Sequence, residues 1–388
     1  MTACLVLTAI AWAVATRGAT DLRDLAVLLG LLVAAVVVAR AWPRRDPALW
    51  TAIGAVIVWL IANGPLRTGW SLESVRVPIL VVLVTLTVIV VGRMRSSERE
   101  MLLAGLVVVG SLQAAIALVS WAVLAAGSAS GPARAEGLLG FPNGLGILLV
   151  ATSIVTLREI ERRRGGRLLP AALLLQVAAI LATGSRTAIL IGAIVVCAWL
   201  ALRTARWRAG AGRSAVGSAR ARHVLVVSTL GVGTAVVLWR TAVEPNEDRP
   251  HLWLEALQRI AAAPITGEGA PAAAFRIASP ASRVTTSAHN EILQWTLEYG
   301  LVGLGLAVAV IVLALRSSRP WRLGDRWLQV AALALLASGL TGFSPRISAV
   351  ALAAAVLIGL SAPRAEQAPD QAPVSQTVVS GGSSSPSK

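Results

Sequence analysis

The sequence predicts an all-α integral membrane protein of about twelve transmembrane helices, with an outer polar loop that contains a short helix. Two observations lead to this fold class. Of the 388 residues, 56% are apolar and only 14% are charged, and the mean hydropathy is +0.73. A soluble domain of this size cannot bury so much apolar surface, so the bilayer is the expected solvent.

The apolar residues also fall into runs that charged or Gly/Pro-rich segments separate, with room for roughly a dozen spans of about 20 residues. The first run has no basic segment before it and no small-residue cleavage site after it, so we expect a retained span and not a signal peptide. The predicted spans are 2–16, 24–39, 48–63, 77–92, 101–126, 143–157, 168–183, 187–202, 223–243, 290–315, 326–342 and 347–361.

The arginines orient these spans. The formal net charge is +16, but the arginines lie in short clusters between apolar runs and form no single basic surface, which argues against nucleic-acid binding. Most of them fall on one side when the spans alternate, and the positive-inside rule makes that side cytoplasmic. We therefore expect a multi-pass protein of the inner (plasma) membrane with both termini in the cytoplasm.

Residues 1–361 are predicted to form the membrane domain, and its longest polar stretch is the loop 244–289 on the periplasmic or extracellular face, between spans nine and ten. The tail 362–388 is rich in Pro, Gln, Ser and Gly, so we expect a disordered cytoplasmic segment.

The outer loop is predicted to contain a helix from Arg249 to Ala263. A pair at i, i+4 joins Glu255 and Arg259, and Pro264 ends the helix before a tight turn at Gly267 and Gly269. Its apolar face is predicted to consist of Leu252, Trp253, Ala256, Leu257 and Ile260.

Two further outer segments precede this loop. Arg134 comes shortly before Asn143, which we expect to cap the sixth span beside that arginine. Arg186 stands in the short hairpin from Thr183 to Thr187. At the edge of the hydrocarbon it either reaches out to lipid headgroups or faces the bundle interior and binds an anion.

His289 begins the tenth span, where a helix N-terminus favours anions. Glu291, Gln294 and Glu298 follow as a polar stripe, and Glu298 lies roughly 13 Å deeper along the helix. An acid at that depth is costly unless it is paired or faces a wet cavity, so this stripe marks a candidate site.

Several kinds of chemistry are not expected. The outer segments show no metal-binding spacing of His and carboxylates, and no Walker-type loop is present. Cys4 and Cys197 both lie in apolar runs, which excludes a disulfide framework or thiolate site. We therefore expect no metal and no cofactor. Arginines with one histidine suit a phosphate-bearing substrate.

In this order, these outer features resemble the O-antigen ligase and polymerase superfamily of bacterial membrane glycosyltransferases. The resemblance covers roughly residues 130–305. Its motifs are Arg134-x-x-Gly137…Pro142-Asn143, Ser185-Arg186, Arg249-x-x-x-Trp253-x-x-Ala256…Pro264-x-x-Gly267-x-Gly269…Phe275 and His289-Asn290-Glu291-x-Leu293-Gln294…Glu298-x-Gly300-Leu301-x-Gly303.

The resemblance implies metal-independent transfer of a glycan from undecaprenyl pyrophosphate to a hydroxyl on another glycan or a lipid. Its important residues match Arg186, Arg249 and His289, and more loosely Arg134 and Glu298. The arginines would stabilise the departing pyrophosphate. His289 would either accept the proton of the attacking hydroxyl or donate to the phosphate.

Asn143 and Asn290 are further substrate-binding candidates within the motifs. Trp253 is expected either to stack on a sugar ring or to anchor the loop at the membrane interface. Expected partners are the lipid-linked donor, the acceptor and membrane lipids.

Two alternatives remain. A polymerase that joins repeat units of a capsular or cell-wall polysaccharide would use the same donor chemistry. A twelve-span transporter predicts two similar halves, which the sequence does not show, because the long loop belongs only to the second half.

Overall fold

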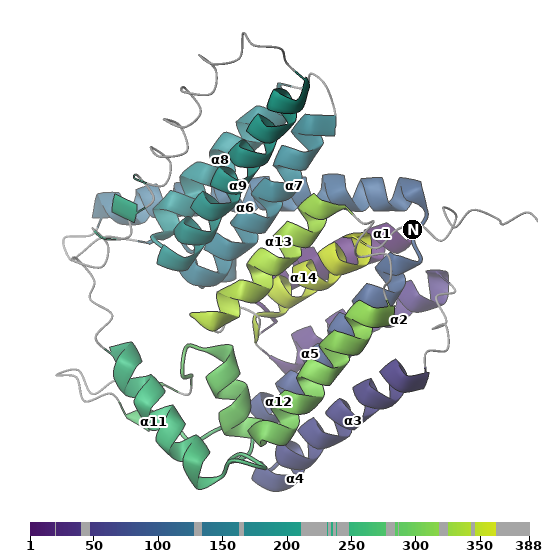
Figure 1. The fold of residues 1–388 in the computed structure, drawn as a ribbon, viewed down its shortest axis with the longest axis vertical. Helices are drawn as coiled ribbons and strands as arrows, with labels where there is room; N and C mark the ends of the chain where they lie inside the picture. Colours follow the sequence, from purple (N-terminus) through teal and green to yellow (C-terminus); the bar gives the residue numbers. More distant parts are fainter. Residues whose placement is uncertain are drawn as a thin grey trace, which may run out of the picture.

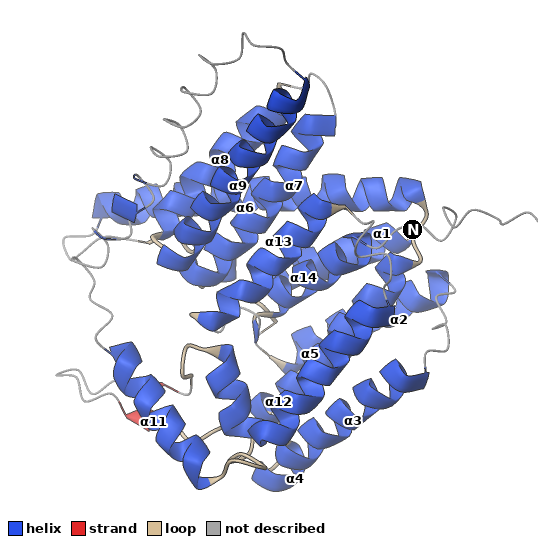
Figure 2. Ribbon diagram, in the orientation of Figure 1, coloured by secondary structure: helices blue, strands red, loops and turns tan. Residues whose placement is uncertain are grey.

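The computed structural model describes residues 1–19, 21–39, 47–127, 134–162, 167–210, 248–276, 284–285, 287–317, 325–342 and 346–361, with a few isolated residues between 231 and 238. Their regular structure is helical, except for one short antiparallel ladder between β1 (Phe275–Arg276) and β2 (Val284–Thr285) (Figures 1 and 2). The predicted all-α class is confirmed.

The first half of the chain consists of α1 (Thr2–Ala15), α2 (Leu22–Ala39), α3 (Pro47–Asn63), α4 (Pro65–Thr68), α5 (Leu72–Gly92), α6 (Ser96–Gly127) and a 3-10 turn (Gly137–Leu139). The described residues of the second half form α7 (Pro142–Arg162), α8 (Leu168–Thr183), α9 (Arg186–Gly210), α11 (Asp248–Ala262), α12 (Glu291–Ser317), α13 (Arg326–Ala337), a 3-10 turn (Ser338–Leu340) and α14 (Ser348–Ser361).

Most predicted spans coincide with these helices to within a few residues. α5 begins earlier than predicted because Ser71 and Ser74 form a capping box that starts the helix ahead of its apolar run. The predicted span 223–243 lies almost entirely outside the described residues.

Six of the described helices are long and apolar enough to cross a membrane: 22–39, 47–68, 72–92, 96–126, 142–162 and 291–313. Five shorter apolar helices accompany them. They fall below the about 20 residues that a full span needs. The count of about twelve spans therefore stays a prediction.

α14 is the central helix of the bundle. It is buried along nearly its whole length and packs against α5 and α13, while α13 packs in turn against α7 (Figure 1). Its small residues let neighbours approach closely, as where Gly359 meets Val91.

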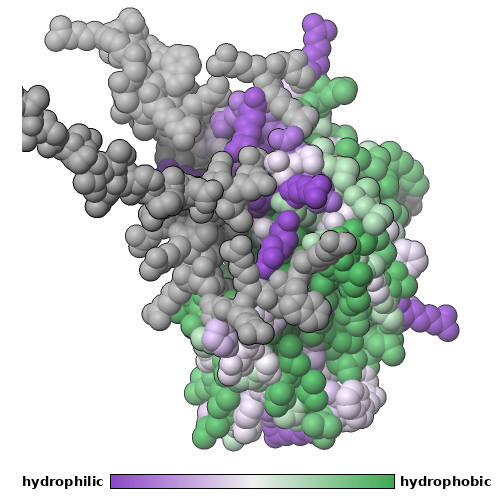
Figure 3. Space-filling view, turned by 90° about the vertical axis from the view of Figure 1, so that its right-hand side faces the viewer, coloured by the Kyte–Doolittle hydropathy of each residue, from purple (hydrophilic) through white to green (hydrophobic). Residues whose placement is uncertain are grey.

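The outer surface of the bundle is apolar. Figure 3 shows one face on which hydrophobic side chains form a broad surface. Val37 on α2, Val119 on α6 and Leu174 on α8 are each more than half exposed, at 69%, 65% and 72%. Soluble proteins rarely expose apolar surface on this scale, and a lipid-facing bundle does so by necessity.

Candidate active site

The segment before α7 is tied to the hairpin between α8 and α9. Arg134 donates from Nε to the Thr183 carbonyl at 2.9 Å and from Nη2 to Asn143 Oδ1 at 2.9 Å. The Ala135 N–H donates to the Ala182 carbonyl at 3.0 Å. These bonds hold Arg134 beside the hairpin that carries Arg186.

Asn143 does not begin α7, because the helix starts one residue earlier, at Pro142. Its side-chain oxygen accepts the bond from Arg134. The prediction that Asn143 caps this helix is therefore wrong. Its side chain instead orients Arg134 through this hydrogen bond.

The hairpin itself has the predicted form. α8 ends at Thr183, and Gly184 at φ +60° adopts the left-handed conformation that commonly follows a helix. Ser185 is buried, and Arg186 is the first residue of α9. Arg186 therefore stands at a helix N-terminus, where anions are favoured.

Three arginines from separate segments form an arginine cluster, which we define as Arg134, Arg186 and Arg249. Arg249 lies in the first turn of α11. Burial, together with the positive charges of Arg186 and Arg134, lowers the pKa of the Arg249 guanidinium. The guanidinium groups of this partly buried cluster repel one another. A bound anion would offset that repulsion, so the cluster is a candidate anion-binding site.

His289 adjoins this cluster. Burial and the positive charge of Arg249 lower the pKa of its imidazole below the usual range. Its backbone has a φ of +51°, an uncommon conformation for a residue with a side chain. Such outliers persist only where the surroundings hold them, and they gather at functional sites.

The surroundings of His289 are specific. Its N–H donates to Ser287 Oγ at 3.1 Å. The neighbouring Ala288 donates its N–H to Gln294 Oε1 at 2.7 Å, and its carbonyl accepts the indole N–H of Trp253 at 2.9 Å. Trp253 thus ties α11 to the loop that carries His289. Its stacking on a sugar ring stays a prediction.

α11 packs on α12 through a small apolar cluster. Leu252 and Ala256 are buried in it, and Trp253 and Ile260 pack against it. Leu257, also predicted on the apolar face, is 52% exposed and lies outside this cluster. The helix turns only part of the predicted stripe toward α12. The cluster's other buried members are Ala272, Phe275, Ala288 and Leu297.

The predicted pair between Glu255 and Arg259 is present at 3.5 Å. Arg259 also forms an ion pair with Glu268, donates to the Ala273 carbonyl at 2.9 Å and lies over the Phe275 ring. It therefore fastens the segment after α11 back onto that helix.

That segment fills a break in α12. Gly300 has a non-helical backbone at φ +67° and ψ −175°. The N–H groups of Glu268 and Gly269 donate to the carbonyls of Leu297 and Glu298, at 2.8 and 3.0 Å. The Leu301 N–H in turn donates to the Pro264 carbonyl at 2.8 Å. The turn thus satisfies backbone groups that the break in α12 would leave unpaired.

The two glycines at this contact have no room for a side chain. A Cβ on Gly267 would lie 2.6 Å from the Gly300 nitrogen, and a Cβ on Gly300 would overlap the Ile265 carbonyl. This close approach of two backbone segments explains why glycine stands at positions 267 and 300 of the sequence motifs.

The polar stripe on α12 has a partner that the sequence analysis missed. Arg346 donates from Nε to Glu291 Oε2 at 2.8 Å and from Nη1 to Glu298 Oε2 at 2.9 Å. Gln294 donates to Glu298 Oε1 at 2.6 Å. A signal was available, since Arg346 lies between two apolar runs while Glu298 needs a cation.

Asn290 has a structural role as the cap of α12. Its Oδ1 accepts the N–H groups of Ile292 and Leu293, at 3.0 and 3.1 Å, and its Nδ2 donates to the Leu340 carbonyl at 3.0 Å. It joins the start of α12 to the end of the segment after α13.

A polar cavity of about 290 Å³ lies beside His289. The buried Nε of Arg76 and the buried Nη2 of Arg346 make no hydrogen bond to the described residues. Arg76 is a second residue that the sequence analysis missed. The cavity is lined by Glu73, Arg76, Val77, Phe141, Pro271, Thr285, Ser287, His289, Gln294, Glu298, Arg346 and Ile347.

The structure thus brings Arg134, Arg186, Arg249 and His289 together from four segments of the chain. His289 lies between the arginine cluster and the polar cavity. Within the described part of the chain, no three His, Cys, Asp or Glu side chains gather as metal ligands. Cationic donors and a histidine whose neutral form is favoured make this a site for an anionic group beside a proton acceptor.

Comparison with known protein families gives a match to part of the chain. Residues 171–308, from α8 into α12, match the family model described as O-antigen ligase. The matched segment contains Arg186, Arg249 and His289, while Arg134 and Arg346 lie outside it. A search of curated proteins found no match.

Proposed function

We propose that this membrane protein of an O-antigen ligase-like family transfers a glycan from an undecaprenyl-pyrophosphate carrier to an acceptor hydroxyl, without a metal, at the outer face of the inner membrane. The main support for the proposal is that Arg134, Arg186 and Arg249 lie close together beside His289. Donor, acceptor and catalytic residues are all part of the proposal.

The arginine cluster would bind the pyrophosphate. As the bond between the anomeric carbon and the phosphate oxygen breaks, negative charge grows on the leaving group, and preorganised guanidinium groups stabilise it. Many glycosyltransferases assign this task to a metal ion. Three arginines in one partly buried place are a suitable replacement.

His289 would act as the general base. The acceptor oxygen bonds to the anomeric carbon, and its proton passes to the imidazole. Burial and Arg249 lower the pKa of His289, so the neutral, proton-accepting form dominates at neutral pH. This favours the base over the alternative role as a proton donor to the phosphate.

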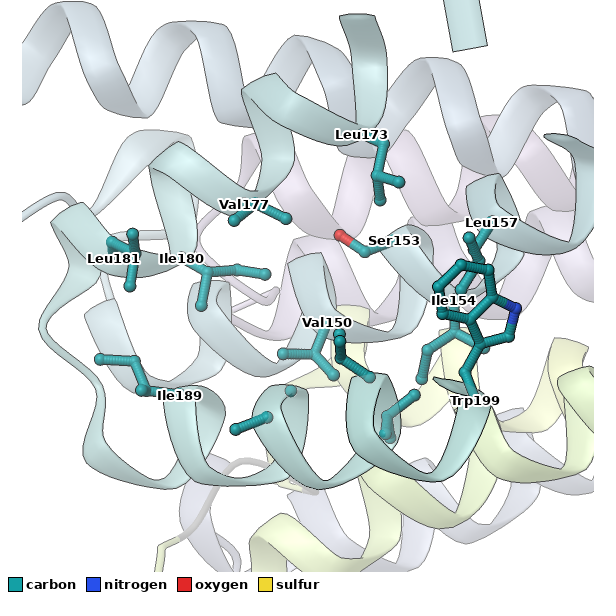
Figure 4. Close-up of a pocket in the computed structure, with 14 residues that line it drawn as sticks. Val150, Ser153, Ile154, Leu157, Leu173, Val177, Ile180, Leu181, Ile189 and Trp199 are labelled. Carbon is teal, nitrogen blue, oxygen red and sulfur yellow. The ribbon is translucent and has the colours of Figure 1, made fainter. Parts of the chain in front are cut away.

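The carrier's isoprenoid chain has a suitable groove next to the cluster. An apolar groove of about 540 Å³ lies between α7, α8 and α9, and the Ser153 hydroxyl and the Trp199 indole nitrogen are polar atoms in its lining (Figure 4). Val177 and Leu181 at its rim are 42% and 50% exposed. Ile189, in its lining, stands about one helical turn from Arg186. This groove would thus hold the chain below the pyrophosphate.

The direction of α7 supports the proposed outer location. Asn143 and the arginine cluster lie at its N-terminal end, whereas Arg158 and Arg162, which pair with Asp325, lie at its C-terminal end. The positive-inside rule assigns the latter end to the cytoplasm. Both chain termini are proposed to be cytoplasmic on the same basis.

Neither alternative has better support. A repeat-unit polymerase would use the same arginine cluster and His289, and differs only in its acceptor. A transporter would not require a proton acceptor beside an anion site, and the O-antigen ligase match favours glycan transfer.

Purified protein in liposomes with an undecaprenyl-pyrophosphate-linked oligosaccharide tests the proposal. We expect wild type to release undecaprenyl pyrophosphate and extend an acceptor, and Arg186→Ala and His289→Ala to lose most of that activity. Arg95→Ala, an exposed arginine just beyond the far end of α5, is the control and should behave as wild type. A wild type that neither transfers nor hydrolyses any such donor would overturn the function. Fully active Arg186 and His289 variants would overturn the site.

A further inference from the structure

The short turn after α13 contacts two parts of the site. Ser338–Leu340 form a 3-10 turn that Thr341 ends, and we call these four residues the bridging turn. The hydroxyl oxygens of Thr341 and Thr187 lie 2.6 Å apart, at hydrogen-bond distance. The Leu340 carbonyl accepts the side-chain N–H of Asn290 at 3.0 Å. The bridging turn is therefore bonded to two helix starts that are far apart in the sequence.

Both bonded residues are sequence neighbours of residues proposed to act on the substrate. Thr187 follows Arg186 in the first turn of α9, and Asn290 follows His289 at the start of α12. Asn290 also caps α12, so its position and that of the helix start are linked. A displacement of the bridging turn would therefore move Arg186 and His289 relative to each other.

The bridging turn stands on a helix that is held at both ends. At its start, Asp325 caps α13 and forms ion pairs with Arg158 and Arg162 of α7. At its end, Ser338 is buried, and its hydroxyl donates to the Leu335 carbonyl at 2.7 Å. α13 and α14 lie between the group of α7, α8 and α9 and the group of α3, α5 and α12 (Figure 1). The bridging turn is thus placed where one segment reaches both groups.

The site has a physical reason to need a fixed spacing. Arg186 and Arg249 carry like charges and come from separate helices, so they repel each other when no anion is bound. In the proposed reaction, the bond to the pyrophosphate breaks at the same carbon to which the acceptor hydroxyl bonds. The groups that serve the two oxygens must therefore keep one separation, and a misplacement of about 1 Å can lower a rate about a hundredfold.

We propose that the bridging turn sets the separation of Arg186 and His289, and that Thr341 is a positioning residue for glycan transfer. The proposal rests on the proposed function and adds a residue to it. The bridging turn lies outside the segment that matches the family model, whereas its two bonding partners lie inside that segment. The two hydrogen bonds thus join the matched segment to a part of the chain beyond it.

Two substitutions separate the hydroxyl of Thr341 from its shape. Thr341→Val keeps the volume and removes the hydroxyl, whereas Thr341→Ser keeps the hydroxyl and removes a methyl group. We expect Thr341→Val to lower kcat for transfer about tenfold, because the lost bond lets Arg186 shift, and Thr341→Ser to stay near wild type. Thr87→Val is the control, since it removes a buried hydroxyl whose bond stays within α5. Full activity in Thr341→Val, or an equal loss in Thr341→Ser, would overturn the proposal.

The partner hydroxyl tests whether both threonines act through one bond. We expect Thr187→Val, Thr341→Val and the double variant to lose activity by the same factor, since each removes the same hydrogen bond. In an Arg186→Ala background, Thr341→Val should lower the residual transfer no further, because the residue that it positions is gone. Multiplying effects of the two single variants, or an undiminished effect in Arg186→Ala, would overturn the positioning role.

Hydrogen exchange tests the bridging turn without any reaction. Amide exchange is followed by mass spectrometry in wild type and in Thr341→Val, both in nanodiscs without donor. In Thr341→Val we expect exchange about fivefold faster in peptides that cover 183–190, a smaller increase over 287–293, and no change in α14. Unchanged exchange in both site segments would overturn the proposal, whatever the activity. Faster exchange in both, with a wild type that transfers no glycan, would leave the bridging turn in place and overturn the proposed function.

Discussion

Arg346 donates hydrogen bonds from Nη1 to both carboxylate oxygens of Glu298, at 2.9 and 3.2 Å. Glu298 is 3% exposed and lies two turns inside α12, where an unpaired acid would be costly. The pair joins α12 to the segment before α14 and forms one wall of the polar cavity beside His289.

Arg346→Met is expected to destabilise the protein. Glu291 and Glu298 would both lose their cation, and removal of one partner from a buried pair costs about 3 kcal/mol. Thermal unfolding in detergent measures the effect. Arg346→Lys should retain part of the stability, since the charge stays. An unchanged unfolding temperature in Arg346→Met would show that the pair is not needed to bury Glu298.

The pH dependence of transfer should reveal His289. Because the pKa of His289 is lowered, its imidazole stays neutral down to a lower pH than usual. The midpoint of the acid limb of the pH–rate profile should therefore lie below the ordinary pKa of about 6.5. Arg249→Gln removes the positive charge that opposes protonation, so that limb should move up toward 6.5 even as the rate falls. Arg95→Gln should not move it. A limb that stays in place in Arg249→Gln would contradict the role of His289 as the titrating base.

Gly300→Ala should be strongly destabilising. The substitution puts a Cβ against the Ile265 carbonyl at a positive φ, and strain of this kind costs about 1–3 kcal/mol. Gly305→Ala in the same helix is the matched control, because its Cβ would meet nothing within 4 Å. There alanine should gain up to about 1 kcal/mol from helix propensity. The unfolding temperature should fall in Gly300→Ala and stay the same or rise in Gly305→Ala. Protease cleavage after α11 should increase only in Gly300→Ala.

Trp253→Phe tests whether Trp253 positions the loop that carries His289 or stacks on a sugar ring. The ring remains, but the hydrogen bond to the Ala288 carbonyl is lost, so the loop with His289 loosens and kcat should fall while the KM for donor changes little. Stability should decrease by about 1 kcal/mol. Leu257→Ala, an exposed position on the same helix, should leave kcat unchanged. Full activity of Trp253→Phe would favour stacking on a sugar over positioning of the loop.

The amino-acid sequence by itself determined the elements and most of the candidate site. Apolar runs, the glycine after Thr183 and the proline after α11 are local signals, and the helices begin and end close to where these signals predict. The three arginines of the cluster and His289 were recognisable because motifs keep their order along the chain even when the fold is unknown.

Only the tertiary structure decided how these residues are partnered. Arg346 meets Glu298 across 48 positions of sequence, and Trp253 reaches Ala288 across 35. Local periodicity carries no information about such pairs, because they depend on which helices pack together. The same holds for Leu257, which has the spacing of the apolar face of α11 and is exposed, while Leu252 and Ala256 on that face are buried. A helix pattern specifies a stripe of apolar residues, and the neighbour that covers part of that stripe is chosen by the packing of the whole bundle.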